Sequence, residues 1–158
     1  MAAETEDYTI RAAPFPARSK TASSSINGKE TTATSMSFLD KILITVTQEG
    51  RLAHWVHVPL GISAIDAGAT SQSYLDRDDE DASSDLLPMH HLTATNVLGG
   101  TIPELEVLGQ TLATQIASAI KTQNDRETRM VVLGMGLDKS VSGRQEFSEL
   151  VGLVLEVL

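Results

Sequence analysis

The four histidines are the residues of this chain best suited to hold a metal ion. His54 and His57 lie three residues apart, and His90 and His91 are adjacent. On a strand both spacings point the side chains to opposite faces, so neither pair can share one ion. The chain has no cysteine, and a zinc site would therefore need carboxylates brought in by the fold. We assign no metal site and expect polar histidines on a half-exposed sheet.

A run of acids is the second candidate for metal chemistry, and we name its five members the acidic run: Asp76, Asp78, Asp79, Glu80 and Asp81. A calcium loop of the EF-hand type needs glycine at its sixth position and glutamate at its twelfth. Counted from Asp76, those positions hold Asp81 and Leu87, so the motif fails twice. The run is instead typical of a solvated loop, with docking onto a basic surface as the second interpretation.

The stretch "GMGLDKS", residues 134–140, lies between an expected strand and an expected helix, where phosphate-binding loops occur. A P-loop needs glycine directly before its Lys-Ser pair. Asp138 stands there instead, and its charge would repel phosphate. The G-x-S-x-G elbow of a nucleophilic serine is absent from the chain. We therefore assign no catalytic and no cofactor-binding residue, and the sequence favours a protein that is not an enzyme.

The composition describes one acidic domain. Of the 158 residues, 41% are apolar and 4% aromatic, enough for a single core of aliphatic side chains. The net charge of -9 argues against a partner among nucleic acids or anionic membranes. No apolar run approaches the roughly 20 residues of a membrane span. The acidic first residues lack the apolar core of a signal peptide, so we expect a cytoplasmic protein.

Hydrophobic periodicity predicts six strands and two helices. The strands are expected over residues 18–26, 29–38, 42–47, 51–58, 90–98 and 129–136. The helices are expected from Thr101 to Lys121 and from Ser142 to Leu158, since apolar residues recur there every three or four positions. Both helix starts have capping-box spacing, in which Thr101 pairs with Glu104 and Ser142 with Gln145. Residues 1–17 are expected to form a flexible tail and residues 59–89 a long acidic mobile loop within a single domain, 18–158.

Two turns organise the first strands. Asn27-Gly28 suits a type I′ turn, and Glu49-Gly50 is the next turn signal. We therefore expect an antiparallel meander in which "ILITVTQEGRLAHWVHV", residues 42–58, forms a hairpin. The predicted fold class is α+β, with two layers: a six-stranded mainly antiparallel sheet, in the order βββββαβα, with two helices on one face.

The strands of this hairpin carry apolar residues on both faces, and two helices can cover only one. A monomer rarely leaves a large apolar surface bare. We therefore expect a second subunit on the face that the helices leave open. The expected contact residues are apolar residues of the hairpin such as Ile44, Val46 or Val56.

Three segments together resemble the proteasome assembly chaperone 3 family, in a fungal form. They are "ILITVTQEGRL", "NVLGGTIPELEVLGQTLATQIASAI" and "MVVLGMGLDKSVSGRQEFSELVGLVLEVL". The shared features are the "VTQ-x-G" turn, the "VLxG" entry into the first helix and the "DKS" before the last. The resemblance covers about residues 18–158, with a longer insert at 59–89 than is usual in animal members.

The resemblance implies a non-enzymatic chaperone without a cofactor. Its members pair with proteasome assembly chaperone 4 and help to assemble the α-ring of the 20S core particle near the fifth α-type subunit, in the cytoplasm and the nucleus. A homodimer in isolation stays open beside the heterodimer. A small dimeric α/β scaffold of trafficking or signalling complexes is the alternative function.

We predict that the acidic run steers docking onto a basic face of an α-type subunit and adds little to folding. Changing its five members to Asn and Gln should leave the melting temperature within about two degrees, because solvated surface changes affect stability little. It should slow association at low salt, and screening should remove the difference at high salt. Equal association rates of both proteins at low ionic strength would identify an inert spacer.

Overall fold

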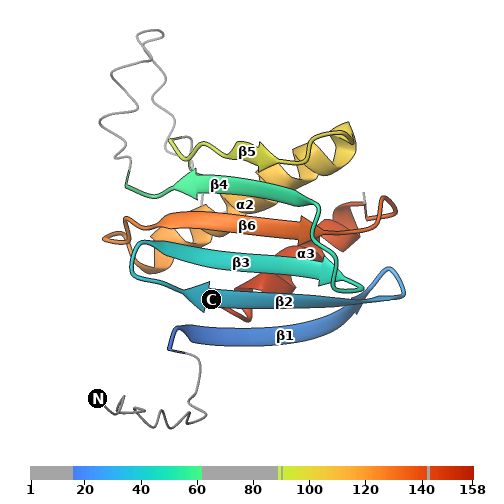
Figure 1. Ribbon diagram of the computed structural model, residues 1–158, viewed down its shortest axis with the longest axis horizontal. Helices are drawn as coiled ribbons and strands as arrows, with labels where there is room; N and C mark the ends of the chain where they lie inside the picture. Colours follow the sequence, from blue (N-terminus) through green and yellow to red (C-terminus); the bar gives the residue numbers. More distant parts are fainter. Residues whose placement is uncertain (1–15, 62–88, 90, 142) are drawn as a thin grey trace, which may run out of the picture.

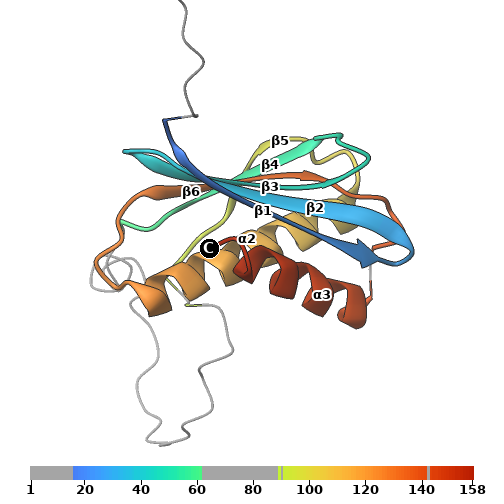
Figure 2. The ribbon, with the colours of Figure 1, turned by 90° about the horizontal axis from the view of Figure 1, so that it is seen from below.

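The computed structural model describes residues 16–61, 89, 91–141 and 143–158. Within these residues, six strands form one sheet, and two helices lie together on one of its faces (Figures 1 and 2). The elements are β1 (Arg18–Ile26), β2 (Lys29–Ser37), β3 (Lys41–Gln48), β4 (His54–Pro59), β5 (Thr95–Leu98), α2 (Pro103–Gln123), β6 (Met130–Gly136) and α3 (Arg144–Leu155). The predicted two-layer α+β fold, with its order of strands and helices, is confirmed.

The strand order in the sheet is β1-β2-β3-β6-β4-β5 (Figure 1). The predicted meander is correct for β1, β2 and β3, which pair antiparallel in sequence. It is wrong for β4, because β6 lies between β3 and β4, parallel to β3 and antiparallel to β4. The hairpin predicted over residues 42–58 therefore does not exist, and its two strands are not neighbours.

The chain leaves β3 through the predicted turn but then crosses the end of β6. Glu49 and Gly50 have the positive φ values of a tight turn, 58° and 69°. After the turn the Ala53 N–H donates to the Met135 carbonyl over 2.9 Å. The Arg51 carbonyl oxygen lies 1.5 Å from where a Cβ on Gly136 would stand. The backbone crossing thus requires glycine at 136. Because of the crossing, β4 lies on the side of β6 that faces away from β3.

The turn at Asn27-Gly28 has the predicted geometry, since φ is positive at both residues, 52° and 75°. Only residues that tolerate this region close a type I′ hairpin without strain. The register of β1 and β2 follows directly, running from Ile26 opposite Lys29 to Arg18 opposite Ser37.

The core lies between the sheet and the two helices. Alternate residues of the three central strands point toward the helices and are buried: Ile42, Ile44, Val46, Val56, Val58, Val131, Leu133 and Met135. The helices contribute Leu112, Ile116, Leu150 and Val154, among others. Gly109 lets α2 approach β6, because a Cβ there would lie 2.6 Å from the Met135 Cε.

The helix starts differ from the predicted capping boxes. Helix α2 begins at Pro103, with Ile102 as a cap that makes no side-chain hydrogen bond, so the cap predicted at Thr101 is wrong by one position. Proline at the first helical position sets this start, because it has no N–H to satisfy. Helix α3 begins at Arg144 after Gly143, again without a side-chain cap. Ser142 lies outside the described residues.

We predict that Gly136→Ala disrupts the crossing of the backbone over β6. It should destabilise the protein by about 3 kcal/mol, since the new methyl group meets a backbone carbonyl that cannot rotate away. The control is Gly152→Ala in α3, where a Cβ would have nothing within 4 Å. That change should stabilise the protein by roughly 0.5–1 kcal/mol through helix propensity. Urea denaturation of both variants is the measurement. A Gly136→Ala protein as stable as the Gly152→Ala protein would contradict the close approach of the backbone at Gly136.

Candidate functional site: the open face of the sheet

Both helices pack on one face of the sheet, and none of the helices and strands of the described residues covers the other face (Figure 2). We call this surface the open face. It consists of the side chains that alternate with the buried ones along each strand. In sheet order its members include Thr21, Ser23, Thr32, Thr34, Met36, Leu43, Thr45, Thr47, Val132, Gly134, Trp55, His57, Val97 and Leu98. Glu30 and Lys41 lie on the same face at the starts of β2 and β3.

An apolar row crosses the middle of the open face. Met36 stands opposite Leu43, Leu43 beside Val132, and Val132 opposite His57. Cross-strand neighbours on one face are close enough for their side chains to touch. All four residues are half-buried without any helix above them, so the row is a continuous apolar strip that ends at an imidazole.

The β1 and β2 side of the open face is made of hydroxyl groups. The Thr21 and Thr34 hydroxyls are 3.1 Å apart, and those of Ser23 and Thr32 are 2.9 Å apart. Such pairs of hydroxyls stabilise neighbouring strands and leave further hydrogen-bonding capacity toward solvent. This half of the open face is therefore polar but uncharged in its middle.

The β4 and β5 side of the open face is apolar and hollow. A Cβ on Gly134 would lie 2.8 Å from the Trp55 Cζ3, so the indole covers this glycine. A cavity of about 320 Å³ opens beside the indole, lined by Trp55, His57, Val97, Leu98 and Val132. Val97 and Leu98 are 59% and 63% exposed. Large apolar groups gathered in this way mark interaction surfaces more often than isolated ones do.

The three apolar residues predicted as contacts lie elsewhere. Ile44, Val46 and Val56 are fully buried and face the helices. Their neighbours in the chain, among them Leu43 and Trp55, occupy the open face instead. The acidic run lies outside the described residues.

The two histidines of β4 point to opposite faces, as predicted. His54 is 5% exposed, and its Nε2 accepts a hydrogen bond of 3.1 Å from the Gly100 N–H. His57 lies on the open face at the rim of the cavity. No three His, Asp or Glu side chains gather as a metal site within the described ranges, which exclude His90.

In the "GMGLDKS" stretch, residues 134–136 end β6. The residues after them form a turn, in which the Val141 N–H donates to the Asp138 carbonyl over 3.1 Å. The Asp138 carboxylate accepts hydrogen bonds from the Lys29 Nζ, over 2.7 Å, and from the Ser140 N–H, over 3.0 Å. The Lys29 ammonium holds the pKa of Asp138 well below its usual range. The Asp138 N–H donates to the Gln48 Oε1 over 2.9 Å, and the Gln48 amide donates to Thr31 over 3.0 Å.

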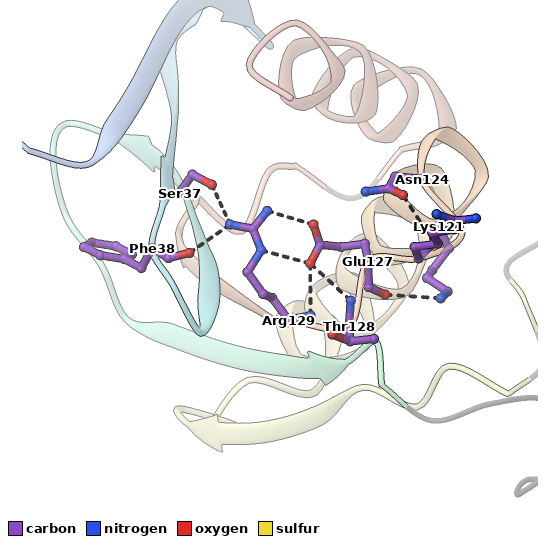
Figure 3. Close-up of polar contacts among 8 residues, drawn as sticks. Ser37, Phe38, Lys121, Asn124, Glu127, Thr128 and Arg129 are labelled. Carbon is purple, nitrogen blue, oxygen red and sulfur yellow. Dashed lines mark hydrogen bonds and ion pairs between the residues drawn. The ribbon is translucent and has the colours of Figure 1, made fainter.

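A second polar cluster fastens the opposite end of the sheet (Figure 3). The Arg129 guanidinium donates to both carboxylate oxygens of Glu127, over 2.9 and 2.7 Å. It also donates to the Ser37 hydroxyl and the Phe38 carbonyl, over 2.7 and 2.8 Å. The loop before β6 is thereby tied to the turn between β2 and β3. The arginine lowers the pKa of Glu127 from 4.5 to about 2.

The helix layer carries another hollow on its outer side. A groove of about 640 Å³ runs between the first turns of α2 and α3, with Val107, Leu108 and Phe147 among its lining residues. Val107 is 64% exposed.

Neither helix of the described structure is long and apolar enough to cross a membrane.

Comparison with solved structures finds a likeness in fold. No protein-family model and no curated protein matches the sequence. The fold is similar to that of a chain from a chaperone complex for yeast 20S proteasome assembly, with a TM-score of 0.53 and 13% sequence identity. The alignment covers 88% of this chain and 97% of the yeast chain. The two proteins therefore share a fold over nearly their whole lengths.

We predict that Glu127→Gln destabilises the protein by about 2 kcal/mol at neutral pH, since the charged carboxyl is the form that Arg129 stabilises. A pKa lowered in the folded state gives stability above the ordinary value of 4.5 that is lost as pH falls toward 2. The difference in the free energy of unfolding between the wild type and Glu127→Gln should therefore disappear as the pH is lowered toward 2. Denaturant unfolding from neutral pH down to about pH 2 measures it.

Glu30→Gln is the matched control, because Glu30 is exposed on β2. It should change stability by less than about 0.5 kcal/mol. A Glu127→Gln protein as stable as the control at neutral pH would show that the Arg129 cluster contributes nothing.

Proposed function

We propose that this chain is a chaperone of 20S proteasome assembly that acts by binding other proteins and not by catalysis. The observation that carries the proposal is the likeness in fold to a chain of the yeast chaperone complex, over 88% of one chain and 97% of the other. Fold alone does not fix function, so the proposal also rests on the open face and on the sequence motifs.

The motif residues support the resemblance by their positions. Gln48 belongs to "VTQ-x-G" and Asp138 to "DKS", and the two are joined by a hydrogen bond of 2.9 Å between the Asp138 N–H and the Gln48 side chain. The two motifs lie 90 residues apart in the chain. Two motifs that meet in the fold are stronger support for a relationship with proteasome assembly chaperone 3 than two unconnected stretches.

We propose that the open face is the pairing surface and that a related chain, similar to proteasome assembly chaperone 4, covers it. Stable interfaces bury about 800 Å² on each partner and are centred on apolar residues with a polar rim. The apolar row and the cavity beside Trp55 supply such a centre, and the hydroxyl groups of β1 and β2 supply part of a rim.

The client of the pair is proposed to be the α-ring of the 20S core particle, near the fifth α-type subunit. This step follows from the family resemblance, as does action in the cytoplasm and the nucleus. With the open face covered by the partner, contacts with the client must come from the edges of the sheet, the helix layer or the insert at 59–89.

Affinity capture of the tagged full-length chain, followed by mass spectrometry, tests this function. We expect a related chaperone chain and free α-type subunits. Leu43→Asp should weaken pairing by about a hundredfold, because pairing would bury an unpaired charge in the centre of the open face. Ser148→Asp adds the same charge to an exposed site on α3 and should leave pairing unchanged.

Melting temperatures of both free variants verify that they fold. Recovery of trafficking or signalling proteins without any proteasome subunit would support the alternative scaffold function. Equal pairing by folded Leu43→Asp and Ser148→Asp proteins would move the interface away from the open face.

A further inference from the structure

The pairing of β4 with β5 contains an irregularity that shapes the open face. Trp55 stands opposite Leu98, but Val56 stands opposite Asn96, so Val97 has no partner of its own and the register shifts between Trp55 and Val56. In a regular strand Val97 and Leu98 would point to opposite faces. A bulge can re-aim a side chain, and here both residues line the cavity on the open face.

This arrangement leaves apolar surface exposed to water in the free chain. Val97 and Leu98 are 59% and 63% exposed, although they are adjacent and part of one cavity wall. Burial of such groups is favourable by roughly 25 cal/mol for each Å² removed from water. Among the described residues, none covers these two aliphatic side chains, so a group that binds here would bury them.

The other walls of the cavity are formed by residues of the paired strands β4 and β6. Trp55 is fixed over Gly134, where a Cβ would come within 2.8 Å of the ring. Val132 is held in the central strand β6 between its neighbours β3 and β4. No Lys, Arg, Asp or Glu is among the lining residues. A cavity with mainly apolar walls fits an aliphatic or aromatic side chain better than a charged one.

We infer that this cavity is an anchor pocket that receives one large apolar side chain from the sheet of the partner chaperone. The inference rests on the proposed pairing through the open face. It adds the place on that face where the binding energy of the pairing is concentrated. The apolar row of Met36, Leu43 and Val132 leads across the open face to the cavity, so the pocket is continuous with the proposed interface. Interfaces typically concentrate their binding energy in one or two anchors of this kind.

Three variants separate an anchor pocket from a merely apolar surface. Leu98→Ser removes one wall. Val97→Phe fills the cavity while increasing apolar surface. Leu39→Ser is the matched control, because Leu39 is 97% exposed in the turn after β2 and outside the open face. All three residues are exposed, so each free variant should melt within about two degrees of the wild type.

The binding partner for the test is the proteasome assembly chaperone 4-like chain of the same organism, titrated by calorimetry. Leu98→Ser and Val97→Phe should each raise the dissociation constant about tenfold or more, and Leu39→Ser should stay within about twofold. A Val97→Phe protein that binds as tightly as the wild type would overturn the pocket, since added apolar surface alone would then suffice.

Failure of the pocket and failure of the function give different results. If the wild type pairs and all three variants pair equally, the anchor is wrong and the proposed function stands. If the wild type pairs neither with that chain nor with a second copy of itself, both the pocket and the pairing are overturned. Self-pairing that is sensitive to the two cavity variants would keep the pocket but replace the partner.

Discussion

The position of β6 between β3 and β4 is the constraint on which the rest of the structure depends. Its residues alternate between the core, through Val131, Leu133 and Met135, and the open face, through Val132 and Gly134. A strand that is apolar on both faces suits the middle of the sheet, where its neighbours on each side continue both the core and the apolar row. The crossing of the chain over Gly136 makes that place available, and α2 returns the chain so that β6 runs parallel to β3.

Two polar clusters hold this arrangement at the ends of β2 and β3. Arg129 ties the entry of β6 to the turn after β2, and the Asp138, Gln48 and Lys29 group ties its exit to the end of β3 and the start of β2. With both ends of β6 fixed in this way, the side chains of the open face are arranged in three zones. Hydroxyl groups lie over β1 and β2, an apolar row lies in the middle, and a cavity lies beside Trp55.

Local signals were sufficient for much of the fold. Asn27-Gly28 predicted the first hairpin, and apolar periodicity predicted both helices. The same reasoning failed at Glu49-Gly50, because that turn has hairpin geometry while β6, some 80 residues later, takes the place beside β3. No local pattern reveals such competition between strands, although the continuous apolar run of 130–136 is typical of a central strand.

The site was less predictable than the fold. Strand β3 is apolar on both faces, so its sequence could not tell which set of residues the helices cover, and Ile44 and Val46 proved to be core residues. The bulge that places Val97 and Leu98 together carries no glycine or proline as a signal. Pro103 marked the start of α2, whereas the hydroxyl of Thr101 suggested a start one residue early.

The most direct test of pairing through the open face uses the fluorescence of Trp55, the only tryptophan of the chain. The partner is prepared with its own tryptophans replaced by phenylalanine, and emission is recorded for the free chain and for the complex. We predict that pairing shifts the emission to shorter wavelength and protects it from acrylamide quenching, because the part of the indole that is exposed in the free chain becomes buried in the interface. An unchanged emission spectrum and unchanged quenching in a complex shown to form by native mass spectrometry would contradict the account.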